Sequence, residues 1–322
     1  MKIALVIPSL PRYSETFLTY KIQGLLREGF AVEALVVGVS EKKDIGIPVY
    51  YQPILAAKGP LRWLYSFVLI ANSFLFCPLK SVKLLKVSKK LGYSFFGRFR
   101  MLVVLSNFLK INADWVHFAY GSMAVERAFI GEVINAKISV SFRGYDVSIF
   151  PLNRPGIYQN VWPFVSKIHS ISNDLYSKAL NLGLSKEIPV KVITPAIELA
   201  NYEDVKTKDW SGRPRFLTVA RLHWKKGIEL TLQALSELKV DFEYTLIGEG
   251  EAKERLIFAA HQLGIQDKVR FVGKQKPASV VQAMRDHEYY LQYSVQEGFC
   301  NAVLEAQASK MFCIVSDAEG LG

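Results

Sequence analysis

Short β-type runs alternate with helix-type runs along almost the whole chain, and this alternation constrains the fold more than any other feature. Strands that alternate with helices predict a parallel sheet covered by helices. The predicted strands form two series, residues 2–8, 30–37, 115–118, 137–142, 167–170 and 190–193, then 215–220, 242–247, 269–272, 289–293 and 312–316. A polar stretch near residues 206–214 separates the series. The sequence therefore predicts an α/β protein of two Rossmann-like, doubly wound domains, residues 1–205 and 206–322.

The composition is that of a globular chain. Its 322 residues are 50% hydrophobic and 21% charged, which is enough to bury a core in each domain. The three cysteines show neither metal-ligand nor disulfide spacing, as expected in a reducing cytosol. Residues 1–8 read as a first strand and not as a signal peptide. The longest apolar stretch, residues 63–76, is shorter than the ~18 residues that a membrane span needs, so we expect no transmembrane helix.

The positive charge is concentrated in the first half of the chain. Residues 1–170 contain 21 Lys and Arg against 9 Asp and Glu, whereas residues 171–322 contain 19 against 20. Within the first half, the segment 79–100 holds basic and aromatic residues but no acid. These residues are Lys80, Lys83, Lys86, Lys89, Lys90, Arg98 and Arg100, beside Tyr93, Phe95, Phe96 and Phe99.

Two interpretations of this basic segment remain open. Lysines three residues apart with apolar residues between them predict a basic amphipathic helix that binds anionic lipid headgroups. The protein would then be cytoplasmic and peripheral on the inner face of the cytoplasmic membrane. The alternative is a solvated face over a buried core, because such patterns are common in soluble proteins. No recognition motif supports nucleic acid as a partner.

Residues 297–305, Glu-Gly-Phe-Cys-Asn-Ala-Val-Leu-Glu, lie between a predicted strand and a predicted helix. Asn301 is a good N-cap for a helix over residues 302–310, so the loop directs backbone N–H groups outward, where phosphate binds. Glu297 and Glu305 then place hydroxyl-binding carboxylates on either side of this helix start. The segment predicts half of a sugar-nucleotide site. In the alternative, Glu305 is only a favourable first-turn acid and Glu297 a solvated loop charge.

A basic turn, Arg221-Leu-His-Trp-Lys-Lys-Gly227, follows the predicted strand 215–220 and opens a helix over residues 227–238. Lys225 and Lys226 repel the positive end of that helix unless an anion lies between them, which suggests a bound diphosphate. Arg221 could complete the site. The alternative is a solvated basic turn.

Together these residues resemble the retaining glycosyltransferases of family 4, which have the GT-B architecture. Members carry an Arg-Leu-x-x-x-Lys-Gly segment and, downstream, Glu-Gly-Phe-x-Asn-x-x-x-Glu-Ala. Arg221, Lys226, Glu297 and Glu305 fall on these positions. Residues 248–250, Gly273 and residues 316–321 are weaker similarities. The resemblance implies a GT-B fold in which two Rossmann-like domains face a central cleft.

The resemblance also implies roles for the residues of the second domain. Arg221 and Lys226 would hold the donor diphosphate, Glu297 the hydroxyls of the donor sugar, and Glu305 the ribose. Arg221, Lys226 and Glu297 are accordingly the predicted catalytic residues. The full set predicted to bind the donor is Arg221, Lys226, Gly273, Glu297, Gly298, Phe299, Cys300, Asn301 and Glu305.

The acceptor should bind at the carboxyl ends of the strands in the first domain, where ligands gather in open α/β sheets. The predicted acceptor-binding residues follow three of these strands, and they are Ser14, Glu15, His117, Arg143 and Asp146. The segment Ser-Glu-Thr-Phe at residues 14–17 resembles a subset of the family that builds bacterial cell-surface polysaccharides, such as colanic-acid-type exopolysaccharides. Glu15 has a second interpretation, as a first-turn acid of a helix beginning near Thr16.

Arg143 departs from the family pattern, because many relatives have His in a His-Gly-x-Asp segment at this position. Its guanidinium could contact an anionic acceptor or the donor phosphate. His117 is a second candidate for acceptor contact, although a histidine at a strand end is more often structural. Asp146 would orient either side chain.

The resemblance implies transfer with retention at the anomeric carbon, from a UDP- or GDP-linked sugar to a glycan or a polyprenyl-diphosphate-linked oligosaccharide. Arg221, Lys226 and the helix start near Asn301 would stabilise the departing diphosphate electrostatically, so we expect no metal and no other cofactor. The sequence does not identify the base that activates the acceptor.

Family members usually continue past the segment 316–321, whereas this sequence stops at Gly322. We therefore expect a second domain that is incomplete at its C-terminus, with an exposed sheet edge. Three functions remain open. The chain is an active glycosyltransferase in exopolysaccharide or lipopolysaccharide biosynthesis, a truncated and inactive sugar-nucleotide-binding remnant, or a basic membrane-surface protein without catalysis.

Overall fold

The structure is a computed structural model that describes residues 1–11, 16–40, 44–53, 59–202, 207–208 and 210–321. The chain forms two compact units, Met1–Ile193 and Thr194–Gly322. We call them unit 1 and unit 2 and describe each by itself. The boundary drawn from the sequence, at residue 205, lies slightly later in the chain.

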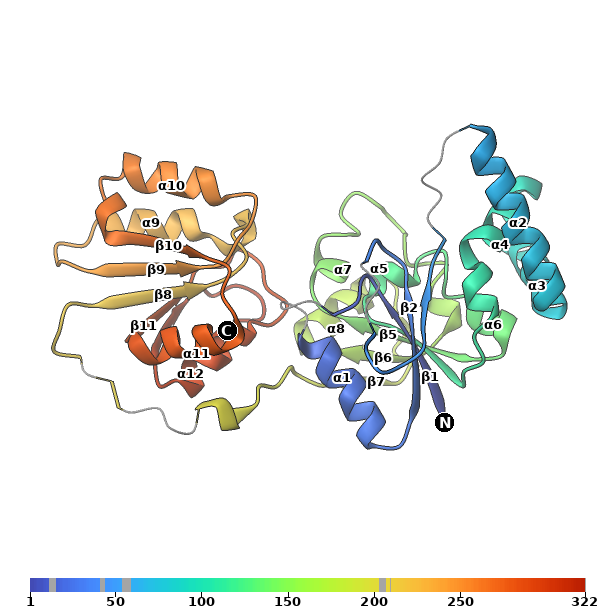
Figure 1. Ribbon diagram of the computed structural model, residues 1–322, viewed down its shortest axis with the longest axis horizontal. Coiled ribbons are helices and arrows are strands. Elements are labelled where there is room, and N and C mark those ends of the chain that lie inside the picture. The colour runs from blue at the N-terminus through green and yellow to red at the C-terminus, as the bar shows by residue number, and fades with distance from the viewer. Residues whose placement is uncertain (12–15, 41–43, 54–58, 203–206, 209, 322) are drawn as a thin grey trace. The chain divides into compact units, whose positions relative to one another are not determined.

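Unit 1 contains a seven-stranded parallel sheet in the order β3-β2-β1-β4-β5-β6-β7 (Figure 1). The strands are β1 (Lys2–Ile7), β2 (Ala31–Val36), β3 (Val49–Tyr51), β4 (Trp115–Phe118), β5 (Lys137–Phe142), β6 (Val165–Ser170) and β7 (Val190–Val192). The six strands predicted for this half of the chain are confirmed. The sequence did not predict β3, because a three-residue, half-buried edge strand has too short a pattern to recognise.

Helices connect these strands and cover the sheet. They are α1 (Thr16–Arg27), α2 (Pro60–Phe76), α3 (Pro78–Lys90), α4 (Phe95–Leu109), α5 (Gly121–Ala124), α6 (Ile130–Ile134), α7 (Tyr145–Ser148) and α8 (Asn173–Asn181). Leu18 and Ile22 on α1 pack against Ile3, Leu5 and Ile7 of β1. This contact places α1 over the face of the sheet to which the odd-numbered residues of β1 point.

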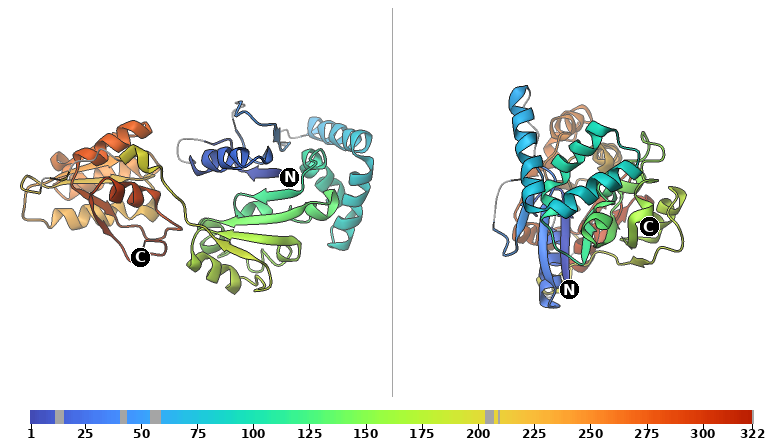
Figure 2. Two further views of the ribbon diagram at one scale, coloured as in Figure 1. Left: turned by 90° about the horizontal axis from the view of Figure 1, so that it is seen from below. Right: turned by 90° about the vertical axis from the view of Figure 1, so that its right-hand side faces the viewer.

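The helices α2, α3 and α4 follow β3 and precede β4 in the chain. They form a group at one edge of unit 1 (Figures 1 and 2). The predicted basic helix over residues 79–100 is two helices, α3 and the first part of α4. Two of its lysines serve the fold. The Lys80 ammonium donates to the carbonyls of Leu109 (3.0 Å) and Ile111 (2.7 Å), and Lys83 donates to Asn135 Oδ1 (2.6 Å).

Among the residues that the structure describes, no single helix is long and apolar enough to cross a bilayer. Residues 61–76 of α2 and the whole of α3 meet the length and composition of a span when they are taken together, but the two helices meet at a bend of 117°.

Unit 2 contains a five-stranded parallel sheet in the order β10-β9-β8-β11-β12. The strands are β8 (Arg215–Val219), β9 (Glu243–Ile247), β10 (Val269–Gly273), β11 (Tyr289–Gln292) and β12 (Phe312–Val315), and all five are as predicted to within one or two residues. Its α-helices are α9 (Ile228–Ser236), α10 (Lys253–Gln262), α11 (Pro277–Asp286) and α12 (Asn301–Ala308). Separate hydrophobic clusters, one around Phe216 and Leu232 and one around Leu217 and Tyr290, show that the sheet is covered on both faces.

Two glycines let the loops at the carboxyl ends of these strands approach each other closely. Gly227 has φ +57°, and a Cβ there would lie 1.8 Å from the carbonyl oxygen of Tyr293. Gly248 has φ +149°, and a Cβ there would lie 1.8 Å from the carbonyl oxygen of Ala220. No real Cβ tolerates such a contact, so the loops after β8, β9 and β11 pack as they do only because these residues are glycines.

We expect Gly248→Ala to lower the free energy of unfolding of unit 2 by more than about 2 kcal/mol, because the new methyl group overlaps a backbone oxygen. Gly264→Ala is the matched control. Gly264 also has a positive φ, +66°, but its Cβ would meet open space, so only the backbone strain of about 1 kcal/mol applies. Urea unfolding of both variants tests the prediction, and equal losses in the two would contradict it.

Candidate functional site

The basic turn lies between β8 and α9. Residues Trp224–Lys226 form a single 3-10 turn, and Gly227, in the left-handed conformation, begins α9. Burial lowers the pKa of Lys225, the charge of Glu297 opposes that shift, and the charges of Arg221 and Lys226 add to it. The three cations and Glu297 therefore lie within electrostatic range of one another, and Glu297 balances part of the positive charge.

The loop after β11 is joined to this turn by a backbone hydrogen bond and an ion pair. The backbone N–H of Val295 donates to the carbonyl of Lys225 at 2.7 Å. Beside this contact, the Lys226 ammonium forms an ion pair with Glu297 Oε1. The side chains are 22% and 11% exposed, so the pair is largely shielded from water. The structure thus brings together the lysine and the carboxylate that the sequence assigned to one site.

A series of hydrogen bonds between buried polar side chains orients Glu297. Ser294 Oγ donates to Glu297 Oε1 at 2.9 Å, Gln292 Nε2 donates to Ser294 Oγ at 2.7 Å, and the Tyr290 hydroxyl donates to Gln292 Oε1 at 3.1 Å. Gln292 and Ser294 are each 1% exposed. Fully satisfied buried networks of this kind fix the orientation of their members. These residues were not predicted from the sequence, because their contacts with Glu297 depend on how the loop after β11 folds back on the strand.

The predicted N-cap of α12 is wrong by one residue. Asn301 is the first helical residue, and Cys300, with φ −106° and ψ 95°, is the N-cap. A Cβ at Gly320 would lie 2.7 Å from the backbone of Gly298, so the loop before the helix packs closely on this glycine. No side-chain hydrogen bond caps the helix. Because helix N-termini attract anions, this end suits a phosphate, and phosphate binding here stays a prediction. Burial raises the pKa of the Cys300 thiol, which keeps it neutral.

Glu305 lies one turn into α12, within electrostatic range of Tyr290. Burial raises the pKa of its carboxyl to about 7. Phe299 is half-buried in the loop before the helix. Gly273 ends β10 with φ +77°, and its carbonyl accepts from the N–H of Gly248 at 3.0 Å. It therefore lies beside the loop after β9 and not beside the ion pair.

In unit 1, Ser14 and Glu15 lie outside the described residues. His117 is within β4 and not after it, and it is 8% exposed. Its Nε2 lies 2.6 Å from the ammonium of Lys21 on α1. The Arg143 guanidinium stacks on the Phe17 ring at 3.6 Å and donates through Nε to the carbonyl of Ala119 at 3.3 Å. Residues from α1, β4 and the loop after β5 therefore meet near the carboxyl ends of β4 and β5.

Asp146 is fully buried, and its carboxylate is occupied by backbone groups. It accepts from the N–H groups of Gly121 (2.8 Å), Arg143 (3.0 Å) and Gly144 (3.0 Å). Burial raises its pKa, and these hydrogen bonds oppose that shift. Asp146 therefore joins the loops after β4 and β5 and positions Arg143 through the backbone.

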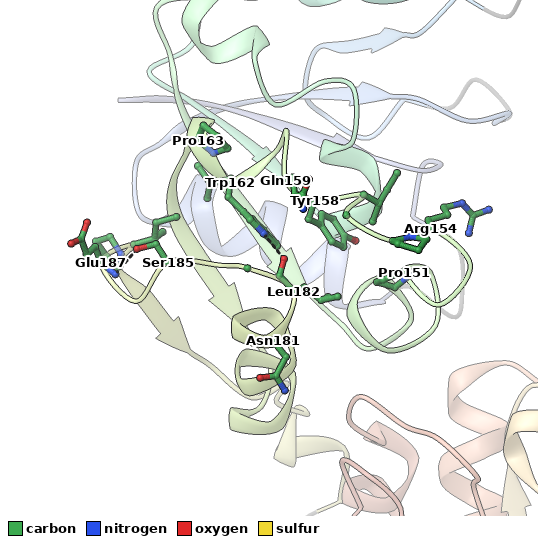
Figure 3. Close-up of a pocket in the computed structure, with 17 residues that line it drawn as sticks. Pro151, Arg154, Tyr158, Gln159, Trp162, Pro163, Asn181, Leu182, Ser185 and Glu187 are labelled. Atoms are coloured by element: carbon green, nitrogen blue, oxygen red, sulfur yellow. Dashed lines mark hydrogen bonds between the residues drawn. The ribbon is translucent and has the colours of Figure 1, made fainter. Parts of the chain in front are cut away.

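A cavity of about 920 Å³ in unit 1 is lined by other residues (Figure 3), one of which, Tyr158, donates through its hydroxyl to the carbonyl of Asp146 at 2.5 Å. It is lined by residues 151–165 and 181–189, which precede or begin β6 and β7, so it opens at the amino ends of these strands. Tyr158 and Trp162 stack on each other at 4.9 Å and are buried. None of the described residues predicted to bind donor or acceptor lines this cavity. In the part of the chain that the structure describes, no three His, Cys, Asp or Glu side chains gather as metal ligands.

Comparison with known proteins agrees with this geometry. Residues 203–322 match the model of the family "Glycosyl transferases group 1". WcaL of Escherichia coli, a glycosyltransferase assigned to colanic acid biosynthesis, is 25% identical over 96% of this chain and 80% of its own length. Residues 203–322 therefore carry a domain similar to the glycosyl transferases of group 1.

Two further proteins are similar to this chain. The N-acetylgalactosamine-N,N'-diacetylbacillosaminyl-diphospho-undecaprenol 4-alpha-N-acetylgalactosaminyltransferase of Campylobacter jejuni is 28% identical over 39% of the chain, which spans only 34% of that relative. Anabaena HepE, solved in complex with UDP and glucose, superimposes with a TM-score of 0.65 at 14% identity, over 99% of this chain and 82% of HepE. The superposition confirms the expected GT-B fold of two Rossmann-like domains.

The pKa of Glu305 predicts a pH dependence of stability. A carboxyl that titrates near 7 when folded and near 4.5 when unfolded contributes stability below pH 4.5 that is lost as the pH rises to 7. We expect the difference in unfolding free energy between the wild type and Glu305→Gln to change by roughly 2 kcal/mol between pH 5 and pH 8. Urea unfolding at both pH values measures it, and a constant difference would show that Glu305 ionises normally.

Proposed function

We propose that this chain transfers a sugar, with retention at the anomeric carbon, from a nucleoside diphosphate sugar to a glycan or polyprenyl-diphosphate-linked acceptor in the synthesis of a bacterial surface polysaccharide. The observation that carries the proposal is the convergence of Arg221, Lys225 and Lys226 with Glu297 at the uncapped start of α12. Cations beside a helix N-terminus suit a diphosphate, and a neighbouring carboxylate suits a sugar hydroxyl.

The contacts of Glu297 suggest how the donor is held. Both the Lys226 ammonium and the Ser294 hydroxyl bind Oε1, which leaves Oε2 to accept from a hydroxyl of the donor sugar. An ammonium carries three N–H groups, so Lys226 keeps donors for a phosphate oxygen while it remains paired. One side chain then fixes the sugar relative to the diphosphate, which is the alignment that transfer requires.

Departure of the nucleoside diphosphate is the demanding step, because negative charge accumulates on its phosphates. Arg221, Lys225, Lys226 and the N–H groups at the start of α12 would stabilise this charge, and the Lys226 ammonium is already held by Glu297 before the reaction. We propose that these groups act without a metal. Glu305 would bind the ribose, and UDP is the nucleotide that HepE binds.

The names of the relatives support the acceptor class. The C. jejuni enzyme is named for a diphospho-undecaprenol acceptor, and WcaL for colanic acid biosynthesis. A polyprenyl-linked acceptor resides in a membrane, so an enzyme that uses it gains from a membrane-binding surface. We propose that α2 and α3 supply this surface on the cytoplasmic side.

The exposure of α2 favours this surface over a solvated face. Trp63 is 75% exposed, Phe67 69% and Phe76 69%, and Leu79 at the start of α3 is 85% exposed. A patch of this kind on a water-facing helix is costly unless a membrane or a partner covers it. Exposed basic residues lie along the same group of helices, as anionic headgroups require. They are Lys86, Lys89, Lys90 and Arg100.

We expect Lys226→Gln to weaken the binding of its nucleotide sugar roughly 30-fold or more, because a partly buried charge contact to phosphate is lost. A thermal-shift titration against UDP- and GDP-linked sugars measures it, since a ligand that binds the native state raises its melting temperature. Lys268→Gln is the control, because Lys268 precedes β10 at the opposite ends of the strands. Lys226→Arg keeps the charge that Glu297 needs and should retain the fold.

Turnover separates an enzyme from a binding remnant. Transfer of radiolabelled sugar to a bacterial lipid extract should occur with the wild type and not with Lys226→Gln. Donor binding without transfer to any extract would favour the remnant, and equal donor binding by Lys226→Gln and Lys268→Gln would contradict the proposed site.

We expect the triple variant Lys86→Gln, Lys89→Gln, Lys90→Gln to bind vesicles of phosphatidylcholine and phosphatidylglycerol about 100-fold more weakly, at about 1 kcal/mol for each lysine near the surface. The matched control removes three exposed lysines elsewhere in unit 1, Lys167, Lys186 and Lys191. Cosedimentation at low salt measures both. Equal losses would mean that attraction depends on net charge alone and would contradict a surface formed by α2 and α3.

A further inference from the structure

One face of the sheet in unit 1 changes from apolar to polar along its width. Under α1 it carries Ile3, Leu5 and Ile7 of β1. Leu5 pairs in register with His117 on β4, and His117 pairs with Ser139 on β5. Farther along, Ser141 pairs with His169 on β6. The same face therefore presents two imidazoles and two hydroxyls across three adjacent strands, where a core would have apolar residues.

These side chains form one continuous hydrogen-bonded network with Lys21 of α1. The Lys21 ammonium donates to His117 Nε2 at 2.6 Å, and His117 Nδ1 lies 2.7 Å from Ser139 Oγ. Ser141 Oγ lies 2.9 Å from His117 Nε2 and 2.8 Å from His169 Nδ1. His169 Nε2 ends the network 3.2 Å from the carbonyl of Ile193. Because a carbonyl only accepts, His169 carries its proton on Nε2.

The network contains an excess of positive groups. Arg143, which follows β5, lies close enough to influence the titration of Lys21, His117 and His169. Among the described residues, no carboxylate contributes to the pKa of any of these three groups. The acid Asp146 and the phenol of Tyr120 face Arg143 instead. Lys21 and His169 are partly exposed, so the network reaches solvent.

Burial and the excess of positive charge lower the pKa values of these groups. Burial, and then Arg143, lower the pKa of Lys21 to about 7. Burial lowers the pKa of His169 to about 4, and that of His117 lies well below its usual value. Both imidazoles are therefore neutral near pH 7, and Lys21 is the group whose charge changes there. A partly buried ammonium without an anion is unfavourable, and an oxyanion beside it would reverse that.

We propose that Lys21, together with Arg143, forms an oxyanion site in unit 1 that binds a phosphate group of the acceptor. Lysine is a point-charge donor to phosphate, and the guanidinium of Arg143 supplies further N–H donors. The site is distinct from the cations of unit 2, and it gives Arg143 a ligand. The inference rests on the proposed function for the identity of the acceptor, but the oxyanion site itself is testable without turnover.

Binding at this site takes up a proton. At pH 8 most Lys21 side chains are neutral, whereas an adjacent oxyanion raises the pKa of the ammonium and retains its proton. A lysine that acts only as a structural donor to His117 would show no such linkage. Proton uptake therefore separates a ligand site from a structural network.

The experiment uses the full chain with Lys226→Gln, which removes the diphosphate site of unit 2. Sulfate serves as an oxyanion that does not itself titrate near pH 8, and its binding is measured by calorimetry in two buffers of different ionisation enthalpy. We expect uptake approaching one proton for each sulfate bound. Adding Lys21→Met should weaken binding at least tenfold at pH 6.5 and abolish the uptake, whereas Lys21→Arg should bind without uptake because arginine keeps its charge.

Lys186→Met, which removes an exposed lysine in the loop before β7, is the matched control. Equal sulfate binding by the Lys21→Met and Lys186→Met variants, or binding by the parent protein without proton uptake, would overturn the proposal. Melting temperatures show whether Lys21→Met folds, and Lys21→Arg keeps the test decisive if it does not. Pyrophosphate and farnesyl diphosphate then distinguish the source, because tighter binding of the farnesyl compound assigns the site to a lipid-linked phosphate and equal binding assigns it to a free one.

The experiments can contradict the proposed function without contradicting the oxyanion site, and the reverse also holds. Loss of donor binding in the thermal-shift experiment would remove the glycosyltransferase proposal while leaving an oxyanion site with proton uptake in place. Conversely, a chain that transfers sugar but shows no sulfate binding through Lys21 would retain its function and lose this inference.

Discussion

The ion pair between Lys226 and Glu297 is the interaction on which the proposed donor site depends. It joins the turn after β8 to the loop after β11, in a position largely shielded from water. A shielded pair of this kind contributes little net stability, but losing one partner leaves an uncompensated charge. The ion pair instead fixes the position of one group relative to the other. The ammonium that we propose to bind phosphate and the carboxylate that we propose to bind a sugar hydroxyl are held at a fixed separation.

Two features beneath this pair make it rigid. Gly227 brings its turn against the carbonyl of Tyr293, which no residue with a Cβ could approach. The buried chain of Tyr290, Gln292 and Ser294 then orients the carboxylate from the other side. Polar side chains are costly inside a core, and here that cost is offset because each finds a partner. The site is therefore organised before any ligand binds, which is what electrostatic catalysis requires.

Unit 1 uses similar chemistry with a different balance of charge. The carboxylate of Asp146 accepts hydrogen bonds from backbone N–H groups, so it neutralises no lysine of the network. Arg143 stacks on Phe17, and Lys21 donates to His117. The result is a positive region, in contrast to unit 2, where Glu297 balances Lys226. This contrast is physically reasonable for a protein that, as we propose, binds a donor sugar on one unit and an anionic acceptor on the other.

The sequence by itself determined the parallel α/β fold and nearly all of the strands, and it predicted Arg221, Lys226, Glu297 and Glu305 as donor-binding residues, because periodicity and short motifs are local properties. It could not identify Lys21 as a partner of His117, since the two are 96 residues apart. Nor could it assign Ser294 and Gln292 to Glu297, or show that Lys80 and Lys83 bind within the fold while Lys86, Lys89 and Lys90 face solvent. Only the tertiary structure decided these matters, because burial and hydrogen-bond partners arise where distant segments pack, and the pKa of a side chain follows from both.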